Sequence, residues 1–335
     1  MIYRIVNTTK STTIAYTNTA LIKYWGKQDE EQIIPMNNSI SITNDTLKTT
    51  TTVEFSNEYK SDSFILNGEE SKGKIKQKVV THLSYIREIS SNSKYAKVVS
   101  ENNFPTSAGL ASSASGFAAL TMAACSALDL KKSTKELSII SRRGSGSSCR
   151  SFYGGYVEWL KEDDNGDSYA IQLADEKWFD ISNLVIVVNA HKRKINTRDA
   201  MKQSMKTSPF YKSRINNINH QLENIRKAIK EKDFTLLGKT AEMDCLNMHY
   251  IAMTSNPSLI FWTPDTLKIM KAVIELREQD IEAYYTIDTG ANIHILTQPE
   301  FESEVLKRIK ELNNIEQIIN SKIGPGAHEI TEHLF

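Results

Sequence analysis

The segment of residues 105–116, PTSAGLASSASG, limits the possible folds of this chain more than any other part of its sequence. Its side chains are small, and it continues into residues 112–128, which contain no proline and no charged residue. This composition predicts a helix that is buried on more than one side. Backbone N–H groups at its start can approach an anion closely, and the helix dipole favours negative charge there. The segment therefore indicates a phosphate-binding loop, although a buried helix behind an ordinary turn would have a similar sequence.

The residues of this loop that we expect to contact a phosphate are small or carry a hydroxyl group. Hydroxyl groups can hydrogen-bond phosphate oxygens or the hydration shell of Mg²⁺. The sequence has no GxxxxGK[ST] motif, so the segment is not a Walker loop. The candidate cofactor-binding residues are Gly109, Ser112, Ser113 and Ser115.

The remaining pattern predicts an α+β chain with two domains, residues 1–190 and residues 191–335. Asn67-Gly68 is typical of a tight turn between strands. β-Branched residues and alternation predict strands at 12–16, 39–43, 49–55, 181–188, 284–287 and 292–296. Helical spacing predicts helices at 73–89, 112–128, 135–150, 213–232, 234–249, 266–278 and 302–312.

Charge and composition exclude several classes of function. The chain has 41 Lys and Arg against 40 Asp and Glu, which gives a net charge of +1. The excess of basic residues that binding to nucleic acid or to an anionic membrane requires is therefore absent. The N-terminus lacks the apolar core of a signal peptide, and no apolar run is long enough to span a membrane. We therefore expect a cytoplasmic protein that acts on a small molecule.

The three cysteines do not have the spacing of a metal site. We expect Cys125, Cys149 and Cys245 to be buried free thiols, and a disulfide between Cys125 and Cys149 is the alternative. The sequence assigns no metal-ligating residue.

Three further segments combine charged groups with small or aromatic residues. Residues 18–27 place two lysines and two large aromatics beside a glycine, which suits a pocket wall. Residues 142–151, RRGSGSSCRS, are poor helix formers that end near Arg150, whose planar guanidinium can grip a carboxylate or phosphate. Asp288 lies in a turn between two strands. An edge strand with exposed lysines and an ordinary Asx turn would explain the first and last segments equally well when each is taken alone.

Taken together, these segments resemble one family, the mevalonate diphosphate decarboxylases of the GHMP kinase superfamily. The similar blocks occur in that family's order and approximate spacing, and they extend over most of the chain. They are ALIKYWGK at 20–27, PTSAGLASSASGFAAL at 105–120, GSGSSCRSFYGG at 144–155, NTRDAMKQSMKTSPFY at 196–211, and YYTIDTGANIHIL at 284–296.

The resemblance implies a fold and a reaction. The fold is the GHMP kinase fold, with an N-terminal domain like domain 2 of ribosomal protein S5 and a ferredoxin-like C-terminal domain. In the reaction, ATP with Mg²⁺ phosphorylates the 3-hydroxyl of mevalonate 5-diphosphate. The phosphate then leaves, CO₂ is lost and isopentenyl diphosphate forms. The family also suggests a homodimer.

The resemblance also implies roles for single residues. Asp288 matches the catalytic aspartate that faces the 3-hydroxyl, and Arg150 matches the arginine that binds the substrate carboxylate. Lys27 completes the expected catalytic set. The residues that match substrate-binding positions are Lys23, Tyr24, Ser145, Ser147, Thr197 and Arg198.

Two short segments depart from the family pattern. Related bacterial enzymes tend to have serine where this chain has Thr197, and the turn after Asp288 has Thr289 and Ala291 where alanine and proline are expected. These changes leave open a substrate with a single 5-phosphate, as in phosphomevalonate decarboxylases. A GHMP kinase that does not decarboxylate and a non-catalytic binding protein are further alternatives. The set of Asp288, Arg150 and Lys27 counts against both.

Overall fold

The computed structural model of the protein describes residues 10–104, 112–162, 166–188 and 195–335. Its longest strands, β1 (Lys10–Ile22) and β4 (Ser39–Ser56), are antiparallel neighbours in the first of two large sheets. Both are rich in threonine and isoleucine, which suit a pleated and half-buried surface. In the described residues this sheet has the order β14-β1-β4-β7-β5-β6, with β8 on β4 and β9 on β8. The other strands are β5 (Ser63–Leu66), β6 (Glu69–Glu70), β7 (Tyr95–Asn102), β8 (Tyr156–Trp159), β9 (Ala170–Ala174) and β14 (His328–Ile330).

Helices α1 (Gly73–Ser90), α2 (Ser112–Ala127) and α3 (Thr134–Arg142) accompany this sheet, α1 and α2 being packed against it. Side chains of α2 such as Ala118 and Ala123 are fully buried against Val53 and Phe55 of β4, as the absence of charge in this segment predicts. Asn67 and Gly68 both have positive φ in the turn between β5 and β6, which confirms the tight turn.

The predicted helix at 135–150 is interrupted. α3 ends at Arg142, the chain turns at Gly144, and a separate 3₁₀ helix, η1 (Gly146–Phe152), follows. The ring of Phe117 occupies the space that a side chain at Gly144 would need, so the backbone approaches α2 closely at this point. The poor helix formers in this segment therefore mark a change of direction, not a helix interior.

The second sheet has the order β11-β12-β10-β13. Its strands are β10 (Ser182–Val188), β11 (Ala283–Ile287), β12 (Ile293–Thr297) and β13 (Ile315–Lys322). One face packs on α7 (Pro264–Arg277), α8 (Glu302–Lys310) and part of α6 (Phe234–Met253). α5 (Tyr211–Glu231) and α6 pack together, and α4 (Thr197–Thr207) precedes them, a helix that the sequence did not predict. A 3₁₀ turn, η2 (Pro299–Phe301), precedes α8.

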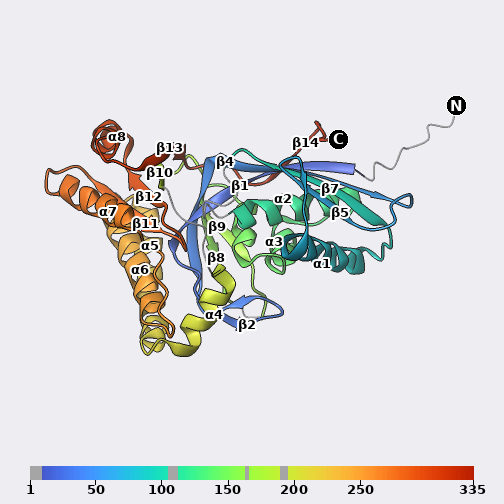
Figure 1. Ribbon diagram of the computed structural model, residues 1–335, viewed down its shortest axis with the longest axis horizontal. Helices are drawn as coiled ribbons and strands as arrows, with labels where there is room; N and C mark the ends of the chain where they lie inside the picture. The colour runs from blue at the N-terminus through green and yellow to red at the C-terminus, as the bar shows by residue number, and fades with distance from the viewer. Residues whose placement is uncertain (1–9, 105–111, 163–165, 189–194) are drawn as a thin grey trace.

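The chain passes from the first sheet to the second between Ala174 and Ser182, earlier than the domain boundary expected near residue 190. We call the residues up to Ala174 the first domain and those from Ser182 the second domain, with β14 returning to the first. Figure 1 shows the two domains side by side, with α4 and the small hairpin of β2 (Lys27–Asp29) and β3 (Ile34–Pro35) close together at the bottom.

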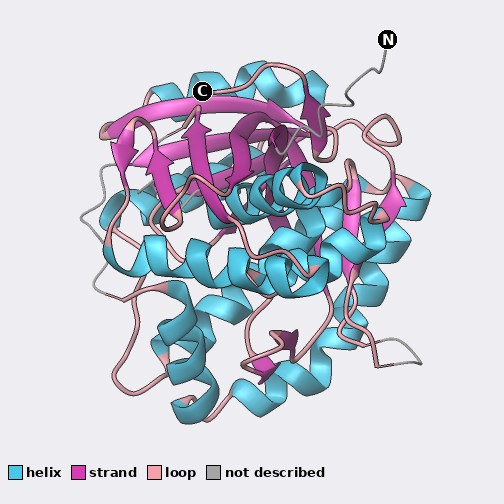
Figure 2. Cartoon of the chain, turned by 90° about the vertical axis from the view of Figure 1, so that its right-hand side faces the viewer, coloured by secondary structure: helices cyan, strands magenta, loops and turns pink. Residues whose placement is uncertain are grey.

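The two domains are joined by apolar and polar contacts. A core between them contains Leu21 and Ile42 of the first sheet and Tyr284 of the second. Beside it, Asn183 donates to Thr19 and to Asn44 at 3.0 and 2.7 Å. Figure 2 shows most of the strands gathered in the upper half of the view, with helices both above and below them. None of the helices in the described residues is long and apolar enough to span a lipid bilayer.

Candidate active site

A cavity of about 570 Å³ lies between the two domains. Both domains contribute charged or hydroxyl side chains to its wall, and most of the residues proposed from the sequence are among them. Those of the first domain include Lys23, Lys27, Ser113 and Arg150, and those of the second include Arg198 and Asp288.

An ion pair between the domains lies in this cavity. Lys23 follows β1, Asp288 follows β11, and the ammonium of Lys23 donates to Asp288 Oδ1 at 2.7 Å. The side chain of Lys23 is only 4% exposed, whereas that of Asp288 is 28% exposed and can meet a ligand. Burial raises the pKa of Asp288, but Lys23, His294 and Arg150 outweigh burial and hold the pKa below its ordinary value. Asp288 is therefore a carboxylate at neutral pH.

Arg150 is held as a planar fork on the wall of the same cavity. Its Nε donates to Ser41 at 2.9 Å, one Nη donates to Ser39 at 2.5 Å, and the other donates to Asn18 Oδ1 at 2.9 Å. Asn18 is fixed in turn by Ser151 at 2.8 Å. Among the described residues, three of the five guanidinium N–H groups thus have partners, and the group is oriented before any ligand binds.

A second basic region lies around Lys27. The Lys27 ammonium donates to Glu30 at 2.6 Å, and the side chain of Glu30 is 50% exposed at the β2–β3 hairpin. Burial lowers the pKa of Lys27; the bond to Glu30 opposes this shift, and the nearby charges of Arg198 and Lys202 add to it. Like charges gathered in this way favour an anion that carries more than one negative charge.

The start of α2 faces the cavity from the first domain. Ser112 and Ser113 line the cavity, and Ser145 donates to Ser113 at 3.2 Å. Ser115 does not belong to this group. Its side chain is fully buried and its hydroxyl lies 2.7 Å from that of Thr49 on β4, so it does not line the cavity, and its contact with a nucleotide stays a prediction. Gly109 lies outside the described residues.

The two departures from the family pattern touch each other. Thr197 begins α4, and its hydroxyl lies 2.6 Å from that of Thr289, the residue after Asp288. The N-cap of this helix is Asn196, which accepts a bond from Asp199 N. The first turn of α4, with Arg198 on it, is thereby tied to the turn that presents Asp288.

The remaining proposed residues, Tyr24, Ser145 and Ser147, also line the cavity, with the ring of Tyr24 packed 4.6 Å from that of Trp159. In this structure it is Lys23 that contacts Asp288, whereas Lys27 contacts Glu30. Sequence reasoning missed Asn18 as a support of Arg150, and it missed Lys78, which faces the cavity from α1 without any motif around it.

The cysteines agree with the expectation of buried free thiols. Cys125, Cys149 and Cys245 are all buried and free. Within the described ranges no group of three His, Cys, Asp or Glu side chains could hold a metal ion.

Two family models match the chain. The diphosphomevalonate decarboxylase-like N-terminal domain matches residues 15–170, and the mevalonate 5-diphosphate decarboxylase C-terminal domain matches residues 183–330. The diphosphomevalonate decarboxylase of Saccharomyces cerevisiae is 37% identical over 319 residues, which cover 89% of this chain and 80% of the yeast protein. That of Homo sapiens is 34% identical over 319 residues, covering 89% and 79%.

Solved structures of similar sequence have the same fold. The mevalonate diphosphate decarboxylase from Staphylococcus aureus superposes with a TM-score of 0.92 at 38% identity, covering 96% of this chain and 98% of that one. A structure of MDDEF in complex with MVAPP, AMPPCP and magnesium gives a TM-score of 0.92 at 39% identity, covering 96% and 99%. The two-domain α+β GHMP kinase fold expected from the sequence is therefore confirmed.

Proposed function

Because this chain belongs to the diphosphomevalonate decarboxylase family, we propose that the cavity between its domains binds ATP and mevalonate 5-diphosphate together. The reaction is the ATP-dependent decarboxylation of mevalonate 5-diphosphate to isopentenyl diphosphate, a step of isoprenoid biosynthesis. The observation that supports this use of the cavity is the convergence of Asp288, Lys23 and Arg150 on its wall.

Asp288 receives the proton of the 3-hydroxyl in this proposal. It is a carboxylate at neutral pH and therefore accepts a hydrogen bond from the hydroxyl. As the hydroxyl oxygen bonds to the γ-phosphorus of ATP, Asp288 takes the proton and ADP departs. Lys23, 2.7 Å away, keeps Asp288 ionised and oriented.

Arg150 grips the carboxylate of the substrate. The bonds to Asn18, Ser39 and Ser41 fix its plane, and the remaining N–H groups hold the carboxylate in one orientation. When the 3-phosphate leaves, the bond between the carboxyl carbon and C2 breaks, and its electron pair forms the double bond while CO₂ is released. Alignment of these bonds lowers the barrier.

Ser112 and Ser113 bind the phosphates of ATP. They stand at the start of α2, where the helix dipole favours negative charge, and Ser145 supports Ser113. Mg²⁺ neutralises phosphate charge when it is bound. No cluster of carboxylates is present for it among the described residues, so the phosphates and these hydroxyls fit its preference for oxygen ligands.

Lys27 and Arg198 bind the 5-diphosphate of the substrate. Both line the cavity on the α4 side, and Lys202 lies near enough to lower the pKa of Lys27 further. This number of positive charges favours two phosphates over one.

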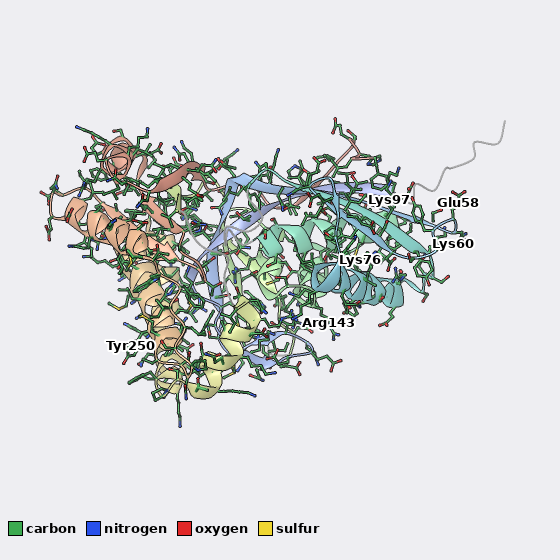
Figure 3. All side chains as sticks on the ribbon, viewed as in Figure 1. Glu58, Lys60, Lys76, Lys97, Arg143 and Tyr250 are labelled. Atoms are coloured by element: carbon green, nitrogen blue, oxygen red, sulfur yellow. The ribbon has the colours of Figure 1, made fainter. Side chains whose placement is uncertain are left out.

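The chain also forms a homodimer in our proposal. Phe210, Met243 and Tyr250 are 42, 57 and 43% exposed, and the rings of Phe210 and Tyr250 are 4.8 Å apart. Figure 3 shows Tyr250 on the outer side of the second domain, directed away from the first. Such an apolar patch suits a subunit interface. Sedimentation equilibrium distinguishes a dimer from a monomer.

The experiment that tests the function supplies mevalonate, its 5-phosphate and its 5-diphosphate in turn with Mg-ATP. ADP and CO₂ are followed separately, because a kinase would form ADP alone. We expect equal amounts of ADP and CO₂ from the 5-diphosphate, at the highest kcat/KM of the three. CO₂ formed mainly from the 5-phosphate would contradict the assigned substrate, and ADP without CO₂ would contradict decarboxylation.

A further inference from the structure

A buried ion pair that does not line the cavity joins α5 to α6. Arg214 donates to Asp244 at 2.8 Å, and each side chain is only 1% exposed. Apolar side chains of similar size often stabilise such a space equally well or better, because burying two charges is costly. The contribution of this pair to the stability of the fold therefore does not explain its presence.

The pair holds the main chain of one residue of the first domain. The N–H of Lys23 donates to Asp244 at 2.7 Å, and Arg214 donates to the carbonyl of Lys23 at 3.1 Å. Asn37 also donates to that carbonyl, at 3.2 Å. Lys23 follows the last residue of β1, so Asp244 and Arg214 take the place of a neighbouring strand for its backbone groups.

The same helix holds the residue next to Asp288. Cys245 accepts a bond from Ile287 N at 3.1 Å, and His249 Nε2 lies 3.3 Å from the Ile287 carbonyl. Burial, with the charge of Lys23, lowers the pKa of His249 to about 3, so the ring is neutral and its Nε2–H donates. α6 therefore holds the main chain on both sides of the Lys23–Asp288 pair.

We propose that Asp244 and Arg214 are positioning residues of the reaction, which fix the Lys23 main chain so that its ammonium stays on Asp288. This inference rests on the roles proposed above for Lys23 and Asp288. Neither Asp244 nor Arg214 lines the cavity, so their effect passes through Lys23.

Release of the Lys23 main chain removes the nearest positive charge from Asp288. Within the described residues, Asp288 interacts electrostatically with five charged or titratable groups. They are Lys23, Arg150, Cys245, His249 and His294. Without Lys23, burial dominates and the pKa of Asp288 rises. The acid limb of the pH–rate profile then moves to higher pH, and kcat falls because Asp288 loses its orientation.

The experiment compares two changes of the pair. Arg214→Lys keeps the charge, but a single ammonium cannot hold Asp244 and the Lys23 carbonyl as the fork does. The double variant Asp244→Leu with Arg214→Met removes both charges and keeps an apolar filling. We expect each to lower kcat at least about 30-fold, to move the acid limb upward, and to change the KM for ATP less than about 3-fold.

Glu242 of α6 and Arg277 of α7 offer a matched control. They form a two-bonded ion pair at 2.9 and 3.0 Å, and Glu242 also accepts a bond from Tyr285 N. The pair does not contact Lys23 or Ile287. Glu242→Gln should lower the melting temperature while leaving kcat and the pH profile as in the wild type.

A folded double variant with wild-type kcat and pH profile would overturn the inference. If the double variant does not fold, wild-type kcat and pH profile in Arg214→Lys would overturn it. Asp288→Asn is measured alongside. An inactive Asp288→Asn with unaffected Arg214 variants would refute the positioning role alone. An active Asp288→Asn would refute the assigned role of Asp288 and the inference with it.

Discussion

The ammonium of Lys23 lies 2.7 Å from a carboxylate oxygen of Asp288, although the two residues belong to different domains. Lys23 comes from the end of β1 in the first sheet, and Asp288 comes from the end of β11 in the second. Neither sheet alone contains this pair.

Removal of the Asp288 charge should abolish most of the activity. We expect Asp288→Asn to lower kcat about 10³-fold, because the amide cannot take the proton of the 3-hydroxyl. Affinity for ATP, measured by equilibrium binding, should change less than about 3-fold. Asp233→Asn is the control, since asparagine also caps a helix and Asp233 caps α6 without lining the cavity. Near-wild-type turnover of Asp288→Asn would contradict its role.

The pH dependence of kcat/KM should report the same carboxylate. The ordinary pKa of an aspartate is 3.8, and Lys23, His294 and Arg150 hold that of Asp288 lower despite burial. The activity depends on the carboxylate form of Asp288. As the pH falls from neutral, this activity is therefore retained, and it is lost only below pH 3.8. In Lys23→Met the pKa rises, so the loss begins at higher pH, by about one unit or more. Lys76→Met, on the surface of α1, should leave the profile unchanged.

Arg150 should not tolerate lysine. A lysine ammonium cannot hold the plane that Asn18, Ser39 and Ser41 fix, so the substrate carboxylate loses its alignment. We expect kcat/KM for mevalonate 5-diphosphate to fall at least about 100-fold in steady-state assays. Arg143→Lys is the matched control, because Arg143 stacks 4.7 Å from Tyr85 and does not line the cavity. Equal activity of Arg150→Lys and the wild type would exclude the proposed grip.

Glu30 should compete with the substrate for Lys27. Its carboxylate binds the Lys27 ammonium at 2.6 Å, and a diphosphate has to displace it. We expect Glu30→Gln to lower the KM for mevalonate 5-diphosphate about 3-fold, a modest effect because half of the Glu30 side chain is exposed. The neighbouring exposed Glu31→Gln should have no effect. A higher KM in Glu30→Gln would show that Glu30 assists binding.

Two glycines in helices should respond to alanine in opposite directions. Gly238 of α6 lies against the ring of Tyr284, so a methyl group there should destabilise the protein by about 1–3 kcal/mol despite the better helix propensity of alanine. Gly116 of α2 has open space, and Gly116→Ala should stabilise by up to about 1 kcal/mol. Urea unfolding measures both. A stabilised Gly238→Ala would mean that Tyr284 moves aside.

Local signals in the sequence located much of this site. The small-residue segment predicted α2 and the serines at its start that line the cavity, and the blocks around Lys23, Arg150 and Asp288 supplied most of the cavity wall. These signals work because each depends on a short stretch of chain. A planar guanidinium or a hydroxyl at a helix start has the same chemistry wherever the fold places it.

Contacts between distant elements could not be predicted in this way. Lys23 and Lys27 stand four residues apart in one block, and only the docking of the second domain selects Lys23 as the partner of Asp288. The side of α2 that Ser115 occupies depends on Thr49 of β4. Asp244 and Arg214 belong to no motif, and their contact arises from the packing of α5 against α6.

The return of β14 to β1 bears on how this protein is made in the cell. Residues 328–330 pair with residues 12–14, and His333 lies 2.6 Å from Thr12, so the edge of the first sheet is completed by the far end of the sequence. A ribosome that has synthesised the whole first domain still holds it with this edge of β1 uncovered. The edge of β1 therefore stays uncovered until the second domain has also been synthesised, and intermediates with this edge exposed are the species that need protection by chaperones.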